Sequence, residues 1–191
     1  HYAAATPTDK RVIDTMVSCM SIEGHFANPH AKDHVYGWEA AESVETAREQ
    51  VASLIGASPL EITFTSGATE SNNLAIFGLA KGLAKKGDTR RHIITSKIEH
   101  KAILEACELL EEDGYKVTYL TPTKEGIITP EMVEDAIDDD TFLVSIAQAN
   151  SVLGAISDVH AIATVCKKHN VFFHTDTAQS IGYLKMDYDH S

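Results

Sequence analysis

Apolar residues recur at helical spacing in the first sixty residues of the chain. The first such pattern predicts an amphipathic helix over residues 9–20, with an apolar face made of Val12, Ile13, Met16, Val17 and Met20. A longer helix is predicted over residues 35–55, and Gly56 is a typical residue to end it. We therefore expect residues 1–60 to form a helical arm or layer beside a larger domain.

From residue 61 onward, short runs rich in apolar and β-branched residues alternate with helical patterns. Helices are predicted between the runs, over residues 69–86, 99–113, 130–138 and 158–169. Strands that alternate with helices indicate an α/β fold with a mainly parallel sheet. Residues 61–191 are therefore predicted to form one α/β domain, with strands over residues 62–65, 92–96, 117–120, 142–147 and 171–175.

Composition narrows the possible partners of the chain. Its 191 residues include 16 Lys and Arg against 28 Asp and Glu, which gives a net charge of −12. Such a charge disfavours binding to nucleic acid and to anionic membrane surfaces. The sequence holds no apolar run near the roughly 18 residues of a membrane-spanning helix and no signal-peptide pattern at its start. We expect a soluble protein, cytoplasmic or else organellar after processing, that binds neither nucleic acid nor membrane.

The three cysteines do not suggest a disulfide framework or a zinc site. Cys19, Cys107 and Cys166 are widely spaced, odd in number and form no CxxC pair. Each follows apolar residues at helical spacing, so each is predicted to be a small core residue.

The segment after the first predicted strand could bind an anion. Residues 62–65 lead into Ser66–Asn72, where Gly67 permits a tight turn before a helix. The N–H groups of a first helical turn have no intrahelical acceptor, and the Thr69 hydroxyl adds a donor. The alternative is an ordinary capped helix, since Ser and Thr are common caps.

Two further junctions between a strand and a helix carry polar residues. Asp176 and Gln179 follow the last predicted strand, and a carboxylate there could pair with a protonated ring nitrogen while an amide donates to a ring oxygen. Alternatively, Asp176 caps a helix and Gln179 is a surface residue. His174 and Asp176 could also suggest a metal, but no further ligands accompany them, so we predict no metal site.

His100 lies at a third junction, after the strand predicted over residues 92–96. An imidazole there could stack on a flat cofactor or transfer protons near neutral pH. In a chain with ten histidines, a solvated surface group is the alternative. The three junctions together make a shared ligand site the stronger hypothesis.

These segments resemble the cofactor motifs of cysteine desulfurases, which are class V aminotransferase-like, fold-type-I pyridoxal-phosphate enzymes. The order and separation of the motifs match, and similar stretches extend over nearly the whole chain. The motifs that carry the resemblance are Thr65–Ala75, Glu99–Lys101 and His174–Ser180. The resemblance implies the three-layer large domain of fold type I, here incomplete, with the smaller C-terminal domain absent.

The resemblance also assigns roles to residues. It implies that Ala68 and Thr69 bind the phosphate of pyridoxal 5'-phosphate and that His100 stacks on the ring and transfers protons. Asp176 is expected to pair with the ring nitrogen and Gln179 with the ring hydroxyl. The family takes sulfur from L-cysteine, releases L-alanine and holds the sulfur as an enzyme persulfide. The implied partners are a sulfur-acceptor protein such as an iron-sulfur scaffold and a second copy in a homodimer.

The sequence departs from the family pattern in several places. Ser151 stands where the family has an Asn that approaches cofactor and substrate, and His1–Pro7 replaces the usual first motif. The family's cofactor-binding lysine and acceptor cysteine have no counterpart here, so we expect the chain to be the N-terminal portion of a longer protein. Two alternatives remain: a non-catalytic homologue or half-subunit that acts as a sulfur-transfer scaffold, and a related class V aminotransferase or lyase.

Overall fold

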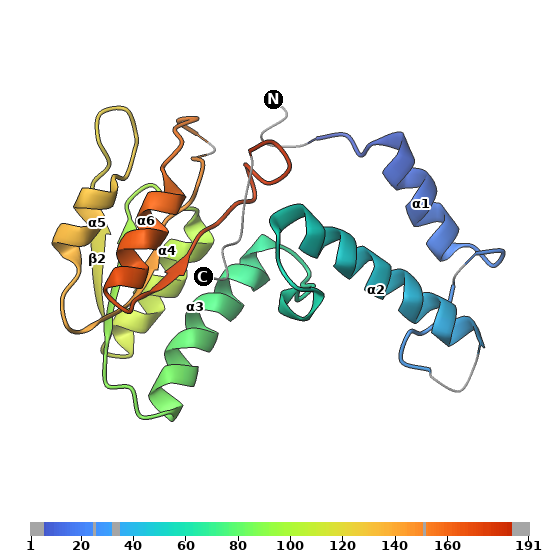
Figure 1. The fold of residues 1–191 in the computed structure, drawn as a ribbon, viewed down its shortest axis with the longest axis horizontal. Helices are drawn as coiled ribbons and strands as arrows, with labels where there is room; N and C mark the ends of the chain where they lie inside the picture. The colour runs from blue at the N-terminus through green and yellow to red at the C-terminus, as the bar shows by residue number, and fades with distance from the viewer. Residues whose placement is uncertain (1–5, 25, 32–34, 151, 185–191) are drawn as a thin grey trace. The chain divides into compact units, whose positions relative to one another are not determined.

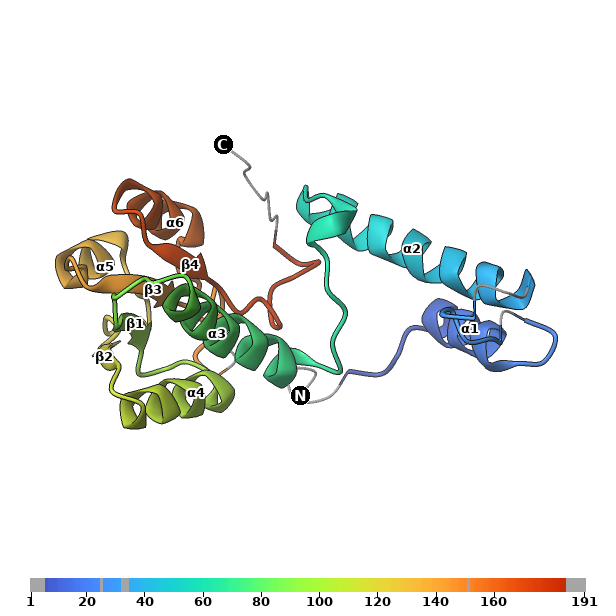
Figure 2. The same ribbon diagram turned by 90° about the horizontal axis from the view of Figure 1, so that it is seen from below.

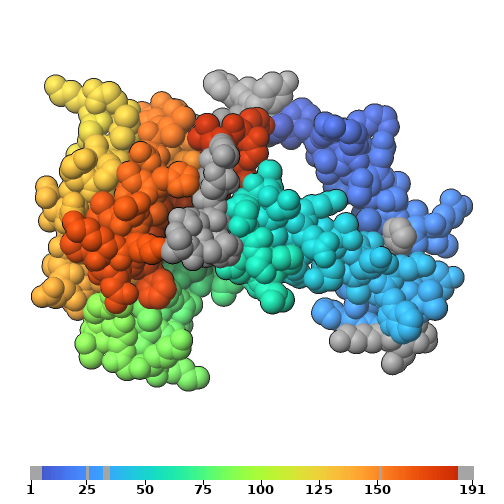
Figure 3. Space-filling model, in the orientation of Figure 1, coloured from blue at the N-terminus to red at the C-terminus, as the bar shows by residue number. Residues whose placement is uncertain are grey.

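The computed structural model describes residues 6–24, 26–31, 35–150 and 152–184 (Figures 1, 2 and 3). It divides into two compact units. One contains residues 1–64 and 182–191, and the other contains Thr65–Ile181. The domain boundary predicted at residue 61 stays a prediction.

The first unit contains two helices, α1 (Lys10–Met20) and α2 (Val35–Ile55), and a short 3-10 helix over Pro59–Glu61. The segment predicted as a strand over residues 62–65 is not one. Arg48 of α2 donates a hydrogen bond to the Ile62 carbonyl, and its guanidinium lies 5.0 Å from the centre of the Phe64 ring. Residues 62–65 thus contact Arg48 of α2 and pair with no strand in the described structure.

Helix α1 begins where the sequence places it, since the side chain of Asp9 accepts a hydrogen bond from the N–H of Arg11. However, none of its residues is buried in the described structure, and Cys19 is exposed. The prediction that Cys19 is a core residue is therefore wrong. The amphipathic pattern of α1 gives an apolar face, but a position on that face is a core position only where another element covers it.

The second unit is an α/β sandwich around a four-stranded parallel sheet. The strand order is β2-β1-β3-β4, and all three neighbouring pairs are parallel. Four of the five predicted strands are thus confirmed. The elements run in the order α3 (Ala68–Lys85), β1 (His92–Ser96), α4 (Lys101–Glu112), β2 (Lys116–Leu120), α5 (Pro130–Ala136), β3 (Thr141–Ser145), α6 (Val159–Lys168) and β4 (Phe172–His174).

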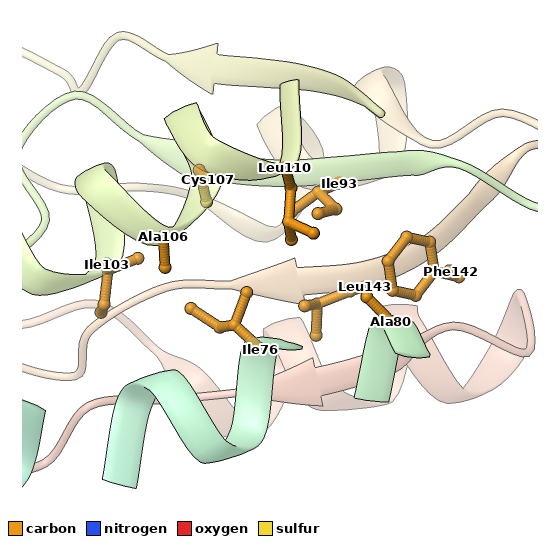
Figure 4. Close-up of a cluster of buried hydrophobic side chains, with 9 residues drawn as sticks. All are labelled: Ile76, Ala80, Ile93, Ile103, Ala106, Cys107, Leu110, Phe142 and Leu143. Carbon is orange, nitrogen blue, oxygen red and sulfur yellow. The ribbon is translucent and has the colours of Figure 1, made fainter. Parts of the chain in front are cut away.

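Alternating residues of the central strands build a core on each face of the sheet. On one face Ile93 and Leu143 pack with α3 and α4, as Figure 4 shows. On the other face Ile94 and Val144 pack with α5 and α6. Figure 2 shows the two helix pairs on opposite sides of the strands. The three-layer α/β architecture is therefore confirmed, as is the burial of Cys107 and Cys166.

Two leucine-sized side chains of α4 allow a test of this core. Ile103 is completely buried between α3 and the sheet, whereas Leu109 is 52% exposed. We expect Ile103→Ala to lower the free energy of unfolding by about 2–5 kcal/mol because it leaves a cavity. The control Leu109→Ala should cost less than about 1 kcal/mol. Chemical denaturation of the purified protein measures both, and equal losses would contradict this assignment of the core.

Candidate functional site

The first turn of α3 presents free N–H groups to solvent. Gly67 is the N-cap residue, and no side chain caps the helix. The nearby carboxylate of Glu70 instead accepts hydrogen bonds from the N–H and hydroxyl of Ser66, both at 2.6 Å. Ala68 and Thr69 are exposed, and a side chain built on Gly67 would meet nothing within 4 Å. This turn therefore has both the space and the donors to bind an anion.

Asp176 lies beside that turn, although it is more than a hundred positions away in the sequence. The Nδ2 of Asn72 in α3 donates to the Oδ2 of Asp176 at 3.0 Å, and Ala178 N–H donates to the Oδ1 at 2.9 Å. Asn72 is 4% exposed. A buried amide thus fixes the carboxylate at the carboxyl end of β4, where ligands of parallel sheets bind.

His174 is the last residue of β4 and precedes Asp176 by two positions. His174 Nδ1 lies 2.8 Å from the hydroxyl of Ser145 on β3. Burial lowers the pKa of the His174 imidazole, and the charge of Asp176 acts in the opposite direction. In the described part of the chain, no three His, Cys, Asp or Glu side chains gather where they could hold a metal ion.

A second carboxyl group, that of Glu99, lies buried at the same edge of the sheet. Its Oε1 accepts a hydrogen bond from the Ser96 hydroxyl at 2.6 Å, and its Oε2 accepts one from the N–H of Ala147 at 3.0 Å. Burial raises the pKa of Glu99 to about 7, and the negative charge of Asp176 adds to the rise, while the two hydrogen bonds oppose it.

His100 is the N-cap residue of α4 and is exposed. Its Nδ1 accepts a hydrogen bond from the N–H of Ala102 at 3.2 Å. In the neutral ring, an accepting Nδ1 leaves the proton on Nε2. The other ring nitrogen is therefore a donor, as a group that meets a cofactor or transfers a proton requires.

The loops after β3 and β4 are tied to each other. The Ser180 hydroxyl donates to the side-chain oxygen of Gln148 at 2.5 Å, and Gln148 N–H donates to the Asp176 carbonyl at 3.2 Å. These bonds hold the turn in which Gln179 is exposed. Asn150 lies beside this loop, and its Nδ2 donates to the Ile98 carbonyl at 2.7 Å. Ser151 and residues 1–5 of the altered first segment, His1–Pro7, lie outside the described residues.

The structure thus brings three of the predicted segments to one edge of the sheet. The turn with His100 follows β1 and Asp176 follows β4, while the hydrogen bond from Asn72 brings the start of α3, with Ala68 and Thr69, to the same edge. That these residues bind a cofactor stays a prediction. Reasoning from the sequence missed the part of Asn72, although a signal existed: Asn72, Ile76 and Ala80 are the buried residues of α3, spaced four apart, and only the first is polar.

The whole chain matches a known family. The family model described as aminotransferase class-V covers residues 1–191. The chain is 51% identical over 186 residues to "Cysteine desulfurase IscS" of Pseudomonas syringae pv. tomato, and 53% identical over 186 residues to the protein of the same name from Shewanella pealeana. Each alignment covers 97% of this chain and 45% of the relative. The chain therefore spans about half the length of the curated relatives it matches.

Solved structures give the same result. A structure described as "SspA in complex with cysteine" superposes with a TM-score of 0.90 at 44% identity, over 97% of this chain and 52% of that one. A "NIFS-LIKE PROTEIN" superposes with a TM-score of 0.90 at 39% identity, over 97% of this chain and 50% of the other. The chain belongs to the class V aminotransferase family, and the relatives it matches within that family include cysteine desulfurases.

Proposed function

We propose that the protein acts as a pyridoxal-phosphate-dependent cysteine desulfurase, which removes sulfur from L-cysteine and forms L-alanine and an enzyme persulfide. The observation that carries the proposal is the hydrogen bond from buried Asn72 to Asp176, which places a fixed carboxylate beside the open first turn of α3. Pyridoxal phosphate has a basic ring nitrogen and an anionic phosphate, and the site offers a partner of the right charge for each. The relatives named cysteine desulfurase supply the choice of substrate.

The residues at the site fit this cofactor. The turn at Gly67 is open to solvent, and the neighbouring amides of Ala68 and Thr69 can donate to phosphate oxygens. Ionised Asp176 favours the protonated form of a ring nitrogen because opposite charges stabilise each other. Class V aminotransferases and cysteine desulfurases depend on pyridoxal phosphate, which agrees with this set of donors and charges.

Each remaining polar group has a task consistent with its position. When bound, pyridoxal phosphate supplies an electron sink that weakens bonds to the α-carbon of an amino acid. His100 presents Nε2 and can hold or release a proton near the ring. Gln179 is exposed in a turn held by Ser180 and can donate to a ring oxygen. The role of Ser151 towards cofactor or substrate rests on its place in the sequence alone.

The persulfide requires a cysteine other than the two buried ones. Burial raises the pKa of Cys107 to about 12 and that of Cys166 to about 12, so neither thiol ionises near neutral pH. The thiolate is the nucleophilic form of cysteine. An exposed and mobile cysteine must therefore accept the sulfur, and the buried pair serve the core.

The proposal extends to the partners of the reaction. The sulfur would pass to an acceptor protein such as an iron-sulfur scaffold, and the enzyme would act as a cytoplasmic homodimer. The relatives that carry the name IscS support the role in iron-sulfur assembly. In the described part of the chain, no helix combines the length and apolar character needed to cross a bilayer.

The first experiment uses the product of the complete open reading frame, purified with pyridoxal phosphate and given L-cysteine together with a thiol that reduces the persulfide and releases its sulfur as sulfide. We expect visible cofactor absorption and one alanine for each sulfur released. Asp176→Asn removes the charge that keeps the ring nitrogen protonated, so alanine formation should fall about 100-fold or more. The control Asp135→Asn, on the exposed side of α5, should leave the rate unchanged.

Two results would overturn the proposed function. Absence of cofactor absorption would exclude the pyridoxal-phosphate site. Cofactor binding without alanine would exclude the desulfurase activity and favour a class V aminotransferase or lyase that acts on another amino acid.

A second prediction tests the hydrogen bond from Asn72. Asn72→Asp places two carboxyl groups at hydrogen-bond distance. They repel each other when both are ionised, and the repulsion is relieved when one of them binds a proton. Without cofactor, we expect the free energy of unfolding to fall by about 1–3 kcal/mol near pH 8. Because the repulsion raises the pKa of the pair in the folded state, the loss should shrink as the pH falls towards about 5.

Chemical denaturation at the two pH values measures this effect. The control Gln50→Glu changes an exposed side-chain amide of α2 to a carboxylate in the same way and should show little loss at either pH. A loss for Asn72→Asp that does not depend on pH would show that Asp176 is not its neighbour.

A further inference from the structure

We propose that Glu99 is a positioning residue of the site, whose buried carboxylate ties the turn after β1 to the end of β3 and thereby fixes His100 at the cofactor edge and sets the charge beside Asp176. The part that concerns the cofactor rests on the proposed function above. The positioning itself concerns only contacts within the chain. Glu99 is a buried ionisable group with no direct part in the chemistry of the proposed function.

The contacts of Glu99 begin where the strand pairing ends. The parallel ladder between β1 and β3 pairs residues as far as Ile94 and Val144. One step further, the hydroxyl of Thr95 donates to the Ser145 carbonyl at 2.9 Å. Glu99 then continues the connection, since it accepts from Ala147 N–H on the β3 side.

Both oxygens of the carboxylate are used in this connection. Oε1 accepts from Ser96 in the same turn at 2.6 Å, and Oε2 accepts from Ala147 at 3.0 Å. Asn150 adds a bond to the Ile98 carbonyl at 2.7 Å. The turn is thus held at Ser96, Ile98 and Glu99, and the next residue is His100, the N-cap residue of α4.

Glu99 is placed to position other groups and not to touch the substrate. It is 7% exposed, and it lines a cavity of about 10 Å3, which has room for about one water molecule. His100, in contrast, is exposed at the same edge. A substrate therefore meets the histidine, while the glutamate acts through the backbone and through its charge.

The protonation state of Glu99 depends on its burial and on the charged groups near it. Asp176 after β4 and Cys107 in α4 face it from the other elements, and the charged or titratable neighbours in its own segment, Lys97, His100 and Lys101, are exposed. Burial raises the pKa of Glu99 to about 7, and the charge of Asp176 acts in the same direction. The ionised carboxylate accepts both hydrogen bonds, whereas the protonated form turns one oxygen into a donor.

Two consequences follow from a change of charge near neutral pH. Ionised Glu99 completes the bridge between β1 and β3, so the turn before His100 is most firmly held above about pH 7. It also adds negative charge near Asp176, which favours a protonated ring nitrogen in the cofactor. The cofactor environment should therefore change with the protonation of Glu99.

A measurement without cofactor tests the buried carboxyl group itself. In infrared difference spectra of the complete protein, we expect the C=O band of a protonated carboxylic acid to grow as the pH falls through about 7. The band should disappear in Glu99→Gln and persist in the control Glu112→Gln, whose side chain is exposed at the end of α4. A band that survives in Glu99→Gln, or that is missing from the wild-type protein, would overturn the proposal.

A measurement with cofactor tests the effect on the site. The visible absorption and circular dichroism of the bound cofactor should change through about pH 7 in the wild-type protein and in Glu112→Gln, and the change should be lost in Glu99→Gln. Cofactor spectra that change with pH in the same way in Glu99→Gln would contradict the positioning role, because a merely structural residue would not carry the transition.

Ser96→Ala keeps the test decisive if Glu99→Gln does not fold. It removes one donor to the ionised carboxylate, so the infrared and visible transitions should both move to higher pH by about one unit. Unchanged midpoints would overturn the proposal. If the wild-type protein takes up no cofactor, the proposed function fails, but the infrared result still decides whether Glu99 is the group that titrates.

Discussion

The hydrogen bond between Asn72 and Asp176 is the contact on which the rest of the site depends. It joins the second turn of α3 to the end of β4, two elements that are far apart in the chain and belong to different layers. The buried side-chain amide of Asn72 needs a hydrogen-bond acceptor, and the carboxylate of Asp176 needs a donor. Their hydrogen bond meets both needs. With this bond in place, the open first turn of α3 and the carboxylate of Asp176 lie at the same edge of the sheet.

The ionisable side chains at this edge of the sheet differ in their surroundings. Asp176 accepts hydrogen bonds from two donors, while burial lowers the pKa of the nearby His174 imidazole. Glu99 lies between these extremes, with two donors but little contact with water. One fixed charge and one group that titrates near neutral pH give the edge a charge that depends on pH.

Much of the fold follows from periodic patterns that the sequence displays. Strand β1 was predicted with the bounds that the structure shows, because all five of its residues are buried and the pattern is strong. Residues 62–65 carry an equally β-rich run, but a strand also needs a partner, and Arg48 binds this segment instead. Cys19 failed for a related reason, since helical spacing predicts an apolar face without showing what covers it.

The candidate site was predictable only in part. Asp176 and His100 were found because both follow a strand of a parallel sheet, where side chains from separate segments meet. Asn72 is marked only as the polar member of the buried face of α3, and Glu99 lies in a turn that has no periodicity. Their roles depend on partners about fifty to a hundred residues away, Ala147 and Asp176. Contacts of that separation arise from the topology of the sheet.

Parallel topology also explains why about half the length of the relatives builds so much of one site. Each strand of the sheet β2-β1-β3-β4 ends at the same edge, so the segments after β1, β3 and β4 meet there. Helix α3 adds its first turn to that edge through Asn72. The groups that would hold the phosphate and the ring nitrogen therefore come from one compact unit, Thr65–Ile181. A sulfur-accepting thiol has the opposite requirement, because it must ionise and reach out to a partner, and the cysteines packed in this unit's core cannot do so.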